Sequence, residues 1–193
     1  MSKIVDARGL NCPQPVILTK QAMEQNADEE IVTLVDNVTA LENVSRLAKS
    51  QNYDVTVAEK DGHFSIHMTR TGEIDDSLVE DHEKVTIMIT SNLFGKGVEE
   101  LGQVLMKSFM FTLTEIQAPV TTLILINSGV YLAVEGSPVL EHLQSLEQQG
   151  CEILSCGTCL DYYGLKEKLA VGQVTNMYTA VEKLLGPDKS LVL

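Results

Sequence analysis

The 193-residue chain is short of positive charge and has no long apolar run. Its 14 Lys and Arg residues face 27 Asp and Glu residues, which gives a formal net charge of -13. Because the basic side chains form no stripe, nucleic acid binding is not expected as its main activity. No apolar run approaches the ~18 residues of a membrane-spanning helix, and the start of the chain lacks the apolar core of a secretory signal. We therefore expect a cytoplasmic protein without a membrane partner.

Cysteine is also scarce, with four residues in the chain. In a cytoplasmic protein so few cysteines do not indicate a disulfide framework; they are reactive, redox-active or merely buried. A zinc site needs more ligands than the close pair Cys156 and Cys159, and Cys151 is expected at the opposite end of their strand. The sequence therefore predicts neither a metal site nor a cofactor.

The acidic charge is concentrated in one short stretch. Residues 71–83 contain 6 acidic and no basic side chains. This stretch has neither a strand nor a helix pattern and repels itself, which is typical of an extended linker. We predict a first domain over residues 1–70, an acidic linker over 71–83 and a second domain over 84–193, with both domains long enough to bury a core.

The first domain shows a change of hydrophobic period. Apolar strands are predicted at 3–6 and 31–35, and helices at 13–26 and 39–50, the second capped by Thr39. From Tyr53 onward apolar and polar residues alternate on both sides of a turn at Asp61-Gly62, which indicates a hairpin. The order βαβαββ predicts a two-layer sandwich with both helices on one face of a single sheet.

The second domain alternates apolar strands with helices. Strands at 85–89 and 122–126 are apolar almost throughout, which indicates a doubly wound α/β domain whose parallel sheet is covered on both faces. Its other predicted elements are helices at 98–116, 138–149, 165–170 and 177–185, a strand at 153–154 and an edge strand at 190–193. In the first of these helices, a stripe is expected to face the core: Val98, Leu101, Leu105, Phe109 and Leu113.

Three loops of the second domain should meet at one rim, because ligand sites of such folds lie outside the carboxyl ends of the strands. The loop 91–97 is glycine-rich and could hold an anion, although a plain strand-to-helix turn is the stronger interpretation. The second of the three loops is 127–130. The loop 155–160 contains Cys156-Gly-Thr-Cys159, whose spacing lets one thiolate attack a bond made by the other. A helix start beside this pair can lower the pKa of either thiol; two inert cysteines are the alternative.

A lone cysteine stands where the first strand gives way to a helix. Pro13 and Pro15 are both expected in the first helical turn, which places Cys12 at or beside the N-cap. The positive end of the helix dipole favours a thiolate there. Arg8 would add positive charge, and Gly9 permits a tight turn. A buried cysteine beside an ordinary helix is the alternative interpretation.

This segment resembles the signature of the TusA/SirA/YedF family of small sulfur-carrier proteins. The matching residues are Asp6, Arg8, Gly9, Leu10, Cys12, Pro13, Pro15, Val16, Thr19 and Lys20. The resemblance implies that Cys12 carries sulfur as a persulfide. It also implies supporting roles in substrate binding or thiolate stabilisation for Arg8, Gly9, Pro13, Pro15 and Lys20.

The C-terminal half resembles the DsrE/DsrF-like sulfur-relay domain, in which a cysteine after a central strand is followed eight residues later by glycine. Cys156 and Gly164 fit this pattern, whereas Tyr163 replaces the usual arginine. The active cysteine is therefore open between Cys156 and Cys159. A TusA-like domain joined to a DsrE-like one resembles the YedF-type proteins associated with selenium metabolism.

Three functions follow from these observations. The first is a sulfurtransferase-like carrier of sulfur, or of selenium, that loads Cys12 from a cysteine desulfurase or another donor and passes it on, through Cys156 or Cys159, to an acceptor protein. The second is a thiol-disulfide redox module built on Cys156 and Cys159. The third is a non-enzymatic regulator that binds a partner through the Cys12 surface. The sequence leaves open whether the chain forms a homo-oligomer.

Overall fold

The computed structural model describes residues 2–26, 30–60, 62–71, 84–116 and 120–193. The chain divides into two compact units, Met1–Val79 and Glu80–Leu193. The predicted linker, residues 71–83, lies outside the described residues apart from Thr71. Among the described helices, none is both long and apolar enough to cross a membrane.

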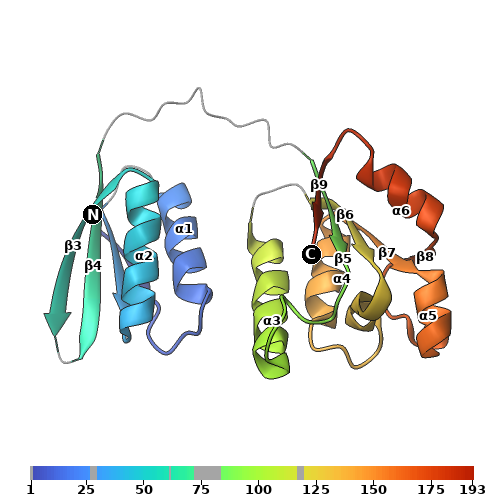
Figure 1. Cartoon of the computed structure of the whole chain (residues 1–193). Helices are drawn as coiled ribbons and strands as arrows, with labels where there is room; N and C mark the ends of the chain where they lie inside the picture. Colours follow the sequence, from blue (N-terminus) through green and yellow to red (C-terminus); the bar gives the residue numbers. More distant parts are fainter. Residues whose placement is uncertain (1, 27–29, 61, 72–83, 117–119) are drawn as a thin grey trace. The chain divides into compact units, whose positions relative to one another are not determined.

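The N-terminal unit has the predicted order of elements. It consists of β1 (Lys3–Asp6), α1 (Gln14–Gln25), β2 (Ile31–Val35), α2 (Val38–Ser50), β3 (Tyr53–Lys60) and β4 (His63–Arg70). The strands lie in the order β1-β2-β4-β3, with β1 and β2 parallel and the other neighbours antiparallel. Figure 1 shows α1 and α2 side by side along one face of this sheet. The predicted two-layer sandwich is therefore confirmed.

The core of this unit lies between the sheet and the two helices. Ile31, Ile66 and Met68 from the strands are fully buried, as are Val44 and Ala48 from α2. Burial of each large aliphatic side chain contributes about 1.5–3 kcal/mol. The core therefore holds both helices on the same face of the sheet.

The cap of α2 differs from the prediction. Asn37, not Thr39, is the N-cap: its side-chain oxygen accepts the backbone N–H of Ala40 at 2.8 Å. Asn37 still has the extended backbone of the preceding strand, whereas the helix begins at the next residue. An asparagine with extended backbone just before a helix can satisfy the third helical amide, so Thr39 is already inside the helix.

The C-terminal unit is a five-stranded parallel sheet. Its strands lie in the order β8-β7-β6-β5-β9, and every neighbouring pair is parallel. The strands are β5 (Val85–Ile89), β6 (Val120–Leu125), β7 (Glu152–Cys156), β8 (Gln173–Thr175) and β9 (Lys189–Val192). The helices are α3 (Glu99–Glu115), η2 (Asn127–Ala133), α4 (Leu140–Gln148), α5 (Gly157–Tyr163), η3 (Lys166–Lys168) and α6 (Met177–Leu184).

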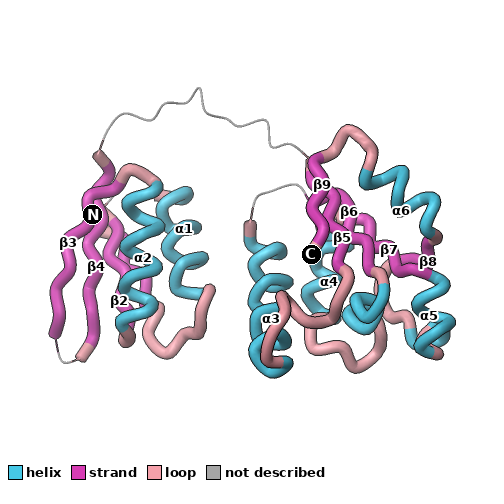
Figure 2. The backbone as a smooth tube through the Cα atoms, in the orientation of Figure 1, coloured by secondary structure: helices cyan, strands magenta, loops and turns pink. Residues whose placement is uncertain are grey.

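Helices cover both faces of this sheet, as predicted (Figure 2). Met110 of α3 and Leu143 of α4 belong to the larger core cluster on one face. Ala180 of α6 packs with Met88 and Ile124 on the other. The doubly wound α/β architecture is therefore confirmed, together with the edge strand near the end of the sequence.

The core-facing side of α3 differs from the predicted stripe. Leu101 is 57% exposed and Val98 is 67% exposed, whereas Met106 and Met110 are buried. The helix approaches the preceding loop at Gly102, where an added Cβ would lie 3.1 Å from Leu93 Cβ. From this glycine onward Met106 and Met110, each one position later than predicted, face the core, whereas Leu113 is buried as predicted and Phe109 packs against the core.

Two short elements also differ from expectation. Residues 165–170, predicted as helical, contain a single 3-10 turn at η3. The three-residue strand β8 was not predicted, because its sequence Gln-Val-Thr has no apolar run. It pairs with the end of β7 and extends the sheet beside Cys156.

Candidate functional site

Cys12 is exposed and lies directly before the start of α1. The helix begins at Gln14, so Pro13 is its N-cap, and only Pro15 lies inside the first turn. The Cys12-Pro13 peptide bond is cis. The predicted position of Cys12 beside the N-cap is therefore correct, whereas the expected place of Pro13 within the helix is wrong.

The opening amides of α1 are already hydrogen-bonded. Gln14 donates to the Asn11 carbonyl at 2.9 Å, and Val16 and Ile17 both donate to the Pro13 carbonyl. Pro13 and Pro15 have no N–H to offer. Among the described contacts, no N–H of the first turn of α1 donates to the Cys12 sulfur.

A small hollow beside Cys12 lies between the starts of α1 and α2. Its volume is about 30 Å³, which is roughly the space of one water molecule. The lining residues are Leu10, Cys12, Pro15, Val16, Asn37, Thr39, Ala40 and Asn43. Polar residues at the start of α2 therefore line the hollow together with the thiol, and the hollow can admit a small group beside Cys12.

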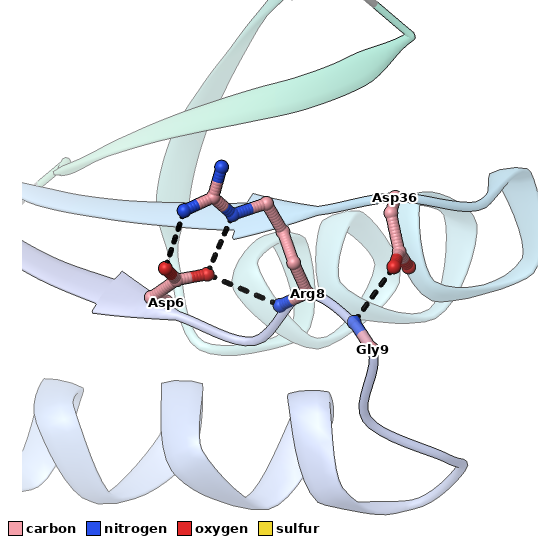
Figure 3. A network of polar contacts seen from close by, with 4 residues as sticks. All are labelled: Asp6, Arg8, Gly9 and Asp36. Atoms are coloured by element: carbon pink, nitrogen blue, oxygen red, sulfur yellow. Dashed lines mark hydrogen bonds and ion pairs between the residues drawn. The ribbon is translucent and has the colours of Figure 1, made fainter.

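Arg8, expected to add positive charge near Cys12, is paired with Asp6. Figure 3 shows the guanidinium against this carboxylate, with Nε at 2.8 Å and the second nitrogen at 2.6 Å. The Arg8 hydrogen bonds lower the pKa of Asp6 to about 2. The charge of Arg8 is thus largely balanced within the turn that precedes Cys12.

Asp36, which the sequence reasoning did not single out, holds the same turn from the other side. Its carboxylate accepts the Gly9 N–H at 2.6 Å (Figure 3), and this bond, with a second from Asn37, lowers the pKa of Asp36. Gly9 has a φ of +73°, the left-handed conformation that glycine adopts without a Cβ penalty. Asp36 therefore ties the segment before Cys12 to the junction between β2 and α2.

Lys20 lies further along α1 and forms an ion pair with Glu24 at 3.8 Å. It is six residues beyond the first helical residue, which corresponds to about 9 Å along the axis. Of the predicted supporting residues, Pro15 lines the hollow beside Cys12. Arg8, Gly9 and Pro13 are neighbours of Cys12 in the chain, whereas Lys20 lies further along α1.

Replacing Asp6 by Asn is expected to reduce the pH dependence of stability. The pKa of this carboxyl is about 2 in the folded chain against an ordinary 3.8, so the unfolded chain takes up the proton first as pH falls. The stabilising effect is present above pH 3.8 and disappears as pH falls through about 2. Thermal unfolding followed by circular dichroism over this range should decline less steeply in Asp6→Asn; equal slopes would contradict the expectation.

The three rim loops of the C-terminal unit do meet. Ile126 donates its N–H to the carbonyl of Ile89, the last residue of β5, at 3.0 Å, and an added Cβ at Gly129 would lie 3.5 Å from Ser91 N, so the loops after β6 and β5 are neighbours. Asn127 donates its N–H to the Cys159 sulfur at 3.1 Å, which joins the loops after β6 and β7. The amides of the loop 91–97 are engaged locally, for Leu93 donates to Ser91 and Phe94 to Gly102. These bonds favour a plain turn there.

Cys156 and Cys159 differ in access. Cys156 ends β7 and is 5% exposed, whereas Cys159 lies within α5 and is partly exposed. Burial and the hydrogen-bonded Cys156 sulfur raise the pKa of Cys159, and the Asn127 N–H opposes this rise. The expectation that a helix start lowers the pKa is therefore wrong for Cys159.

Cys151 lies directly before β7, at the end of the strand opposite Cys156, as predicted. It is buried, and burial raises the pKa of its thiol to about 11. In the part of the chain that the structure describes, no three His, Cys, Asp or Glu side chains gather as a metal site would require. Cys151 is thus a core residue rather than a member of the reactive pair.

Known proteins resemble both units. Residues 3–70 match the family model "Sulfurtransferase TusA", and residues 83–191 match the "DsrE/DsrF-like family". A relative from Methanocaldococcus jannaschii, named "Putative sulfur carrier protein", is 42% identical over 59 residues, which are 30% of this chain and 79% of the relative. A solved SirA-like protein from Desulfitobacterium hafniense is 32% identical, covering 38% of this chain and 100% of that chain with a TM-score of 0.34.

The matches define sulfur-carrier and sulfurtransferase proteins as the class to which this molecule is related. The chain belongs to the DsrE/DsrF-like family through its C-terminal unit and carries a TusA domain in front of it. The predicted combination of the two domains is thereby confirmed.

Proposed function

We propose that this protein holds a persulfide sulfur on Cys12 and relays it through the cysteines of its C-terminal unit. The observation that carries the proposal is an exposed Cys12 at the start of α1, inside the segment that matches the TusA family. An exposed thiol at the positive end of a helix is suited to sulfur exchange, because the thiolate is the nucleophile. The adjoining hollow has room for one further atom, such as the outer sulfur of a persulfide.

The loading step needs no net oxidant. The Cys12 thiolate attacks the outer sulfur of a donor persulfide, so that a bond forms between Cys12 and that sulfur while the S–S bond of the donor breaks. The donor cysteine leaves as a thiolate. A cysteine desulfurase is the donor class that we propose, with a separate protein as final acceptor.

The experiment is incubation of the purified chain with a cysteine desulfurase and cysteine, followed by intact-mass spectrometry. The proposal expects a mass gain of one sulfur atom that a thiol reductant removes. A chain that never gains this mass, under conditions in which the desulfurase loads another carrier, would contradict it. Repeating the reaction with selenocysteine tests whether the site also holds selenium, as proposed from the resemblance to YedF-type proteins.

A second function is favoured by the contact between Cys156 and Cys159. Two free thiols at this spacing can form a disulfide, which would make the C-terminal unit a redox module. Its test is titration of the full chain against glutathione buffers. A reversible Cys156-Cys159 disulfide with a potential of about -220 to -320 mV would support this function, and the lack of such a disulfide would remove it.

The boundaries and location are part of the same proposal. We place the TusA-like domain at residues 1–70 and the DsrE-like domain at 84–193, joined by the acidic linker 71–83. Expression of residues 1–70 alone should give a folded domain that still loads sulfur. A cytoplasmic location fits thiols that must remain reduced between transfers.

A further inference from the structure

The sulfur of Cys159 accepts a backbone hydrogen bond from a neighbouring strand end. The Asn127 N–H points at Sγ across 3.1 Å. Asn127 opens η2 directly after β6, and Cys159 lies in α5 directly after β7. A donor aimed at a sulfur stabilises its anionic form relative to the thiol. This contact therefore favours a thiolate at Cys159 against the effect of burial.

Asn127 directs its N–H from an unusual backbone conformation. Its φ is +50°, in the left-handed region that few residues other than glycine adopt, although asparagine tolerates it best. The side-chain oxygen of Asn127 accepts the hydroxyl of Tyr163 at 2.9 Å. This bond links the left-handed residue to the end of α5, the helix that also carries Cys159.

Aromatic packing fixes the position of Tyr163. Its ring centroid lies 5.0 Å from that of Tyr131 and 5.1 Å from that of Tyr162. Tyr131 comes from η2 and Tyr162 from α5, so the Tyr163 ring is held by the same two elements that it joins through its hydroxyl. Its orientation toward Asn127 is thus set by two contacts besides the hydrogen bond itself.

The two sulfurs of the pair differ in their exposure to solvent. Cys156 is 5% exposed at the end of β7, whereas Cys159 is partly exposed. A protein that delivers sulfur reaches Cys159 first and finds Cys156 behind it. Cys156 lies three positions before Cys159 in the chain and acts electrostatically on it, so Cys156 is the neighbour that could receive the sulfur next or form a disulfide.

We propose that Cys159 is the entry sulfur of the C-terminal unit, that the Asn127 N–H stabilises its thiolate, and that Tyr163 is the positioning residue that holds Asn127. This assignment deepens the proposed function and rests on it for the identity of the incoming group. Asn127 contacts the reacting atom. Tyr163 acts only through Asn127.

The transfer step balances without a redox partner. Cys159 first loses its proton to solvent, and its thiolate attacks the outer sulfur of an incoming persulfide. A bond forms between that sulfur and Cys159 Sγ, the S–S bond of the donor breaks, and the donor cysteine leaves as a thiolate that takes up a proton. The group that acts electrostatically on Cys159 from β7 is Cys156. Other titratable side chains on α5 and its neighbours η2 and η3 are Asp161, Tyr162, Tyr163, Tyr131, Lys166, Glu167 and Lys168.

The test measures the reactivity of Cys159 in the full chain without any sulfur donor. Alkylation by iodoacetamide at neutral pH is followed at Cys159 by peptide mass spectrometry, and its pH profile gives the pKa. Asn127→Ala should slow alkylation at neutral pH about tenfold and raise the pKa. Alanine keeps the backbone N–H, but it tolerates the left-handed conformation poorly and loses the bond to Tyr163, so the N–H is no longer held against the charged sulfur. Asn127→Gly should restore most of this loss, since glycine adopts the left-handed backbone without the side-chain anchor.

Tyr163→Phe should also slow the reaction and raise the pKa, whereas Tyr162→Phe, the same change on the exposed neighbour, should have no effect. Adding Tyr163→Phe to Asn127→Gly should not slow alkylation further, because glycine has no side chain for the Tyr163 hydroxyl to hold. Equal rates in Asn127→Ala, Tyr163→Phe and the unmodified chain would overturn the assignment, as would an Asn127→Gly variant as slow as Asn127→Ala. If Asn127→Ala fails to fold, the alkylation rates of Tyr163→Phe and Asn127→Gly alone decide whether the assignment stands.

Failure of this assignment is distinguishable from failure of the proposed function. Sulfur loading of Cys12 by a desulfurase is read by intact mass and involves none of these residues. A chain that loads Cys12 but shows unchanged alkylation in all the variants refutes the role of Asn127 and Tyr163 and leaves the carrier function standing.

Discussion

Cys12→Ser is expected to abolish sulfur loading of the N-terminal unit. A serine hydroxyl occupies nearly the same space but forms no persulfide, so the fold should be retained while the adduct at this position disappears. The adduct on the peptide that contains position 12 should be lost completely, because a serine hydroxyl cannot act as the sulfur nucleophile. Intact-mass spectrometry after incubation with a desulfurase and cysteine measures it directly.

Cys151→Ser provides the matched control. This cysteine is buried and its pKa is raised to about 11 by burial, so its thiol is almost entirely protonated at neutral pH. Loading should therefore be unchanged in Cys151→Ser. Full loading of Cys12→Ser, with the adduct reversed by reductant as in the unmodified chain, would show that Cys12 is not the carrier.

Gly129→Ala is expected to destabilise the C-terminal unit by about 3 kcal/mol, near the upper end of ordinary overpacking. A Cβ at this position would lie 2.5 Å from the Ile89 carbonyl oxygen. That oxygen also accepts the Ile126 N–H at 3.0 Å, so relief of the clash pulls apart the loops after β5 and β6. Urea unfolding followed by tyrosine fluorescence reports on this unit, which contains four of the five tyrosines.

Gly102→Ala separates the clash from the general effect of an added methyl group. An added Cβ there would lie 3.1 Å from a side-chain atom of Leu93 rather than from backbone, and alanine favours a helix interior by about 1 kcal/mol over glycine. We expect Gly102→Ala to change stability by less than about 1 kcal/mol. An equally small change in Gly129→Ala would mean that η2 can move away from β5 at little cost.

The fold was largely predictable because it depends on local patterns. The alternation at Ile66 and Met68 and the apolar strands β5 and β6 identified the two sheets directly. The predicted stripe of α3 was wrong at its first residues, Val98 and Leu101, because the rotation of a helix depends on where its partner comes closest, here at Gly102. Sequence spacing alone carries no signal for that contact.

The site was predictable only where its chemistry is carried by residue type. The cysteine beside two prolines identified Cys12, and the close spacing of two cysteines identified Cys156 and Cys159. The contacts of Asp36 with Gly9 and of Asn127 with Cys159 join residues 27 and 32 positions apart. Ordinary polar residues acquire such roles only through the folded chain, although the left-handed tolerance of asparagine was a weak signal for Asn127.

The most direct test of the carrier function is to locate the first sulfur adduct on the unmodified chain. The protein is mixed with a desulfurase and isotopically labelled cysteine, quenched by alkylation at successive times, digested and analysed by tandem mass spectrometry. We predict that the label appears first on the peptide containing Cys12 and only later on the peptide containing Cys156 and Cys159. Label on the latter peptide while Cys12 remains unmodified would contradict the central claim.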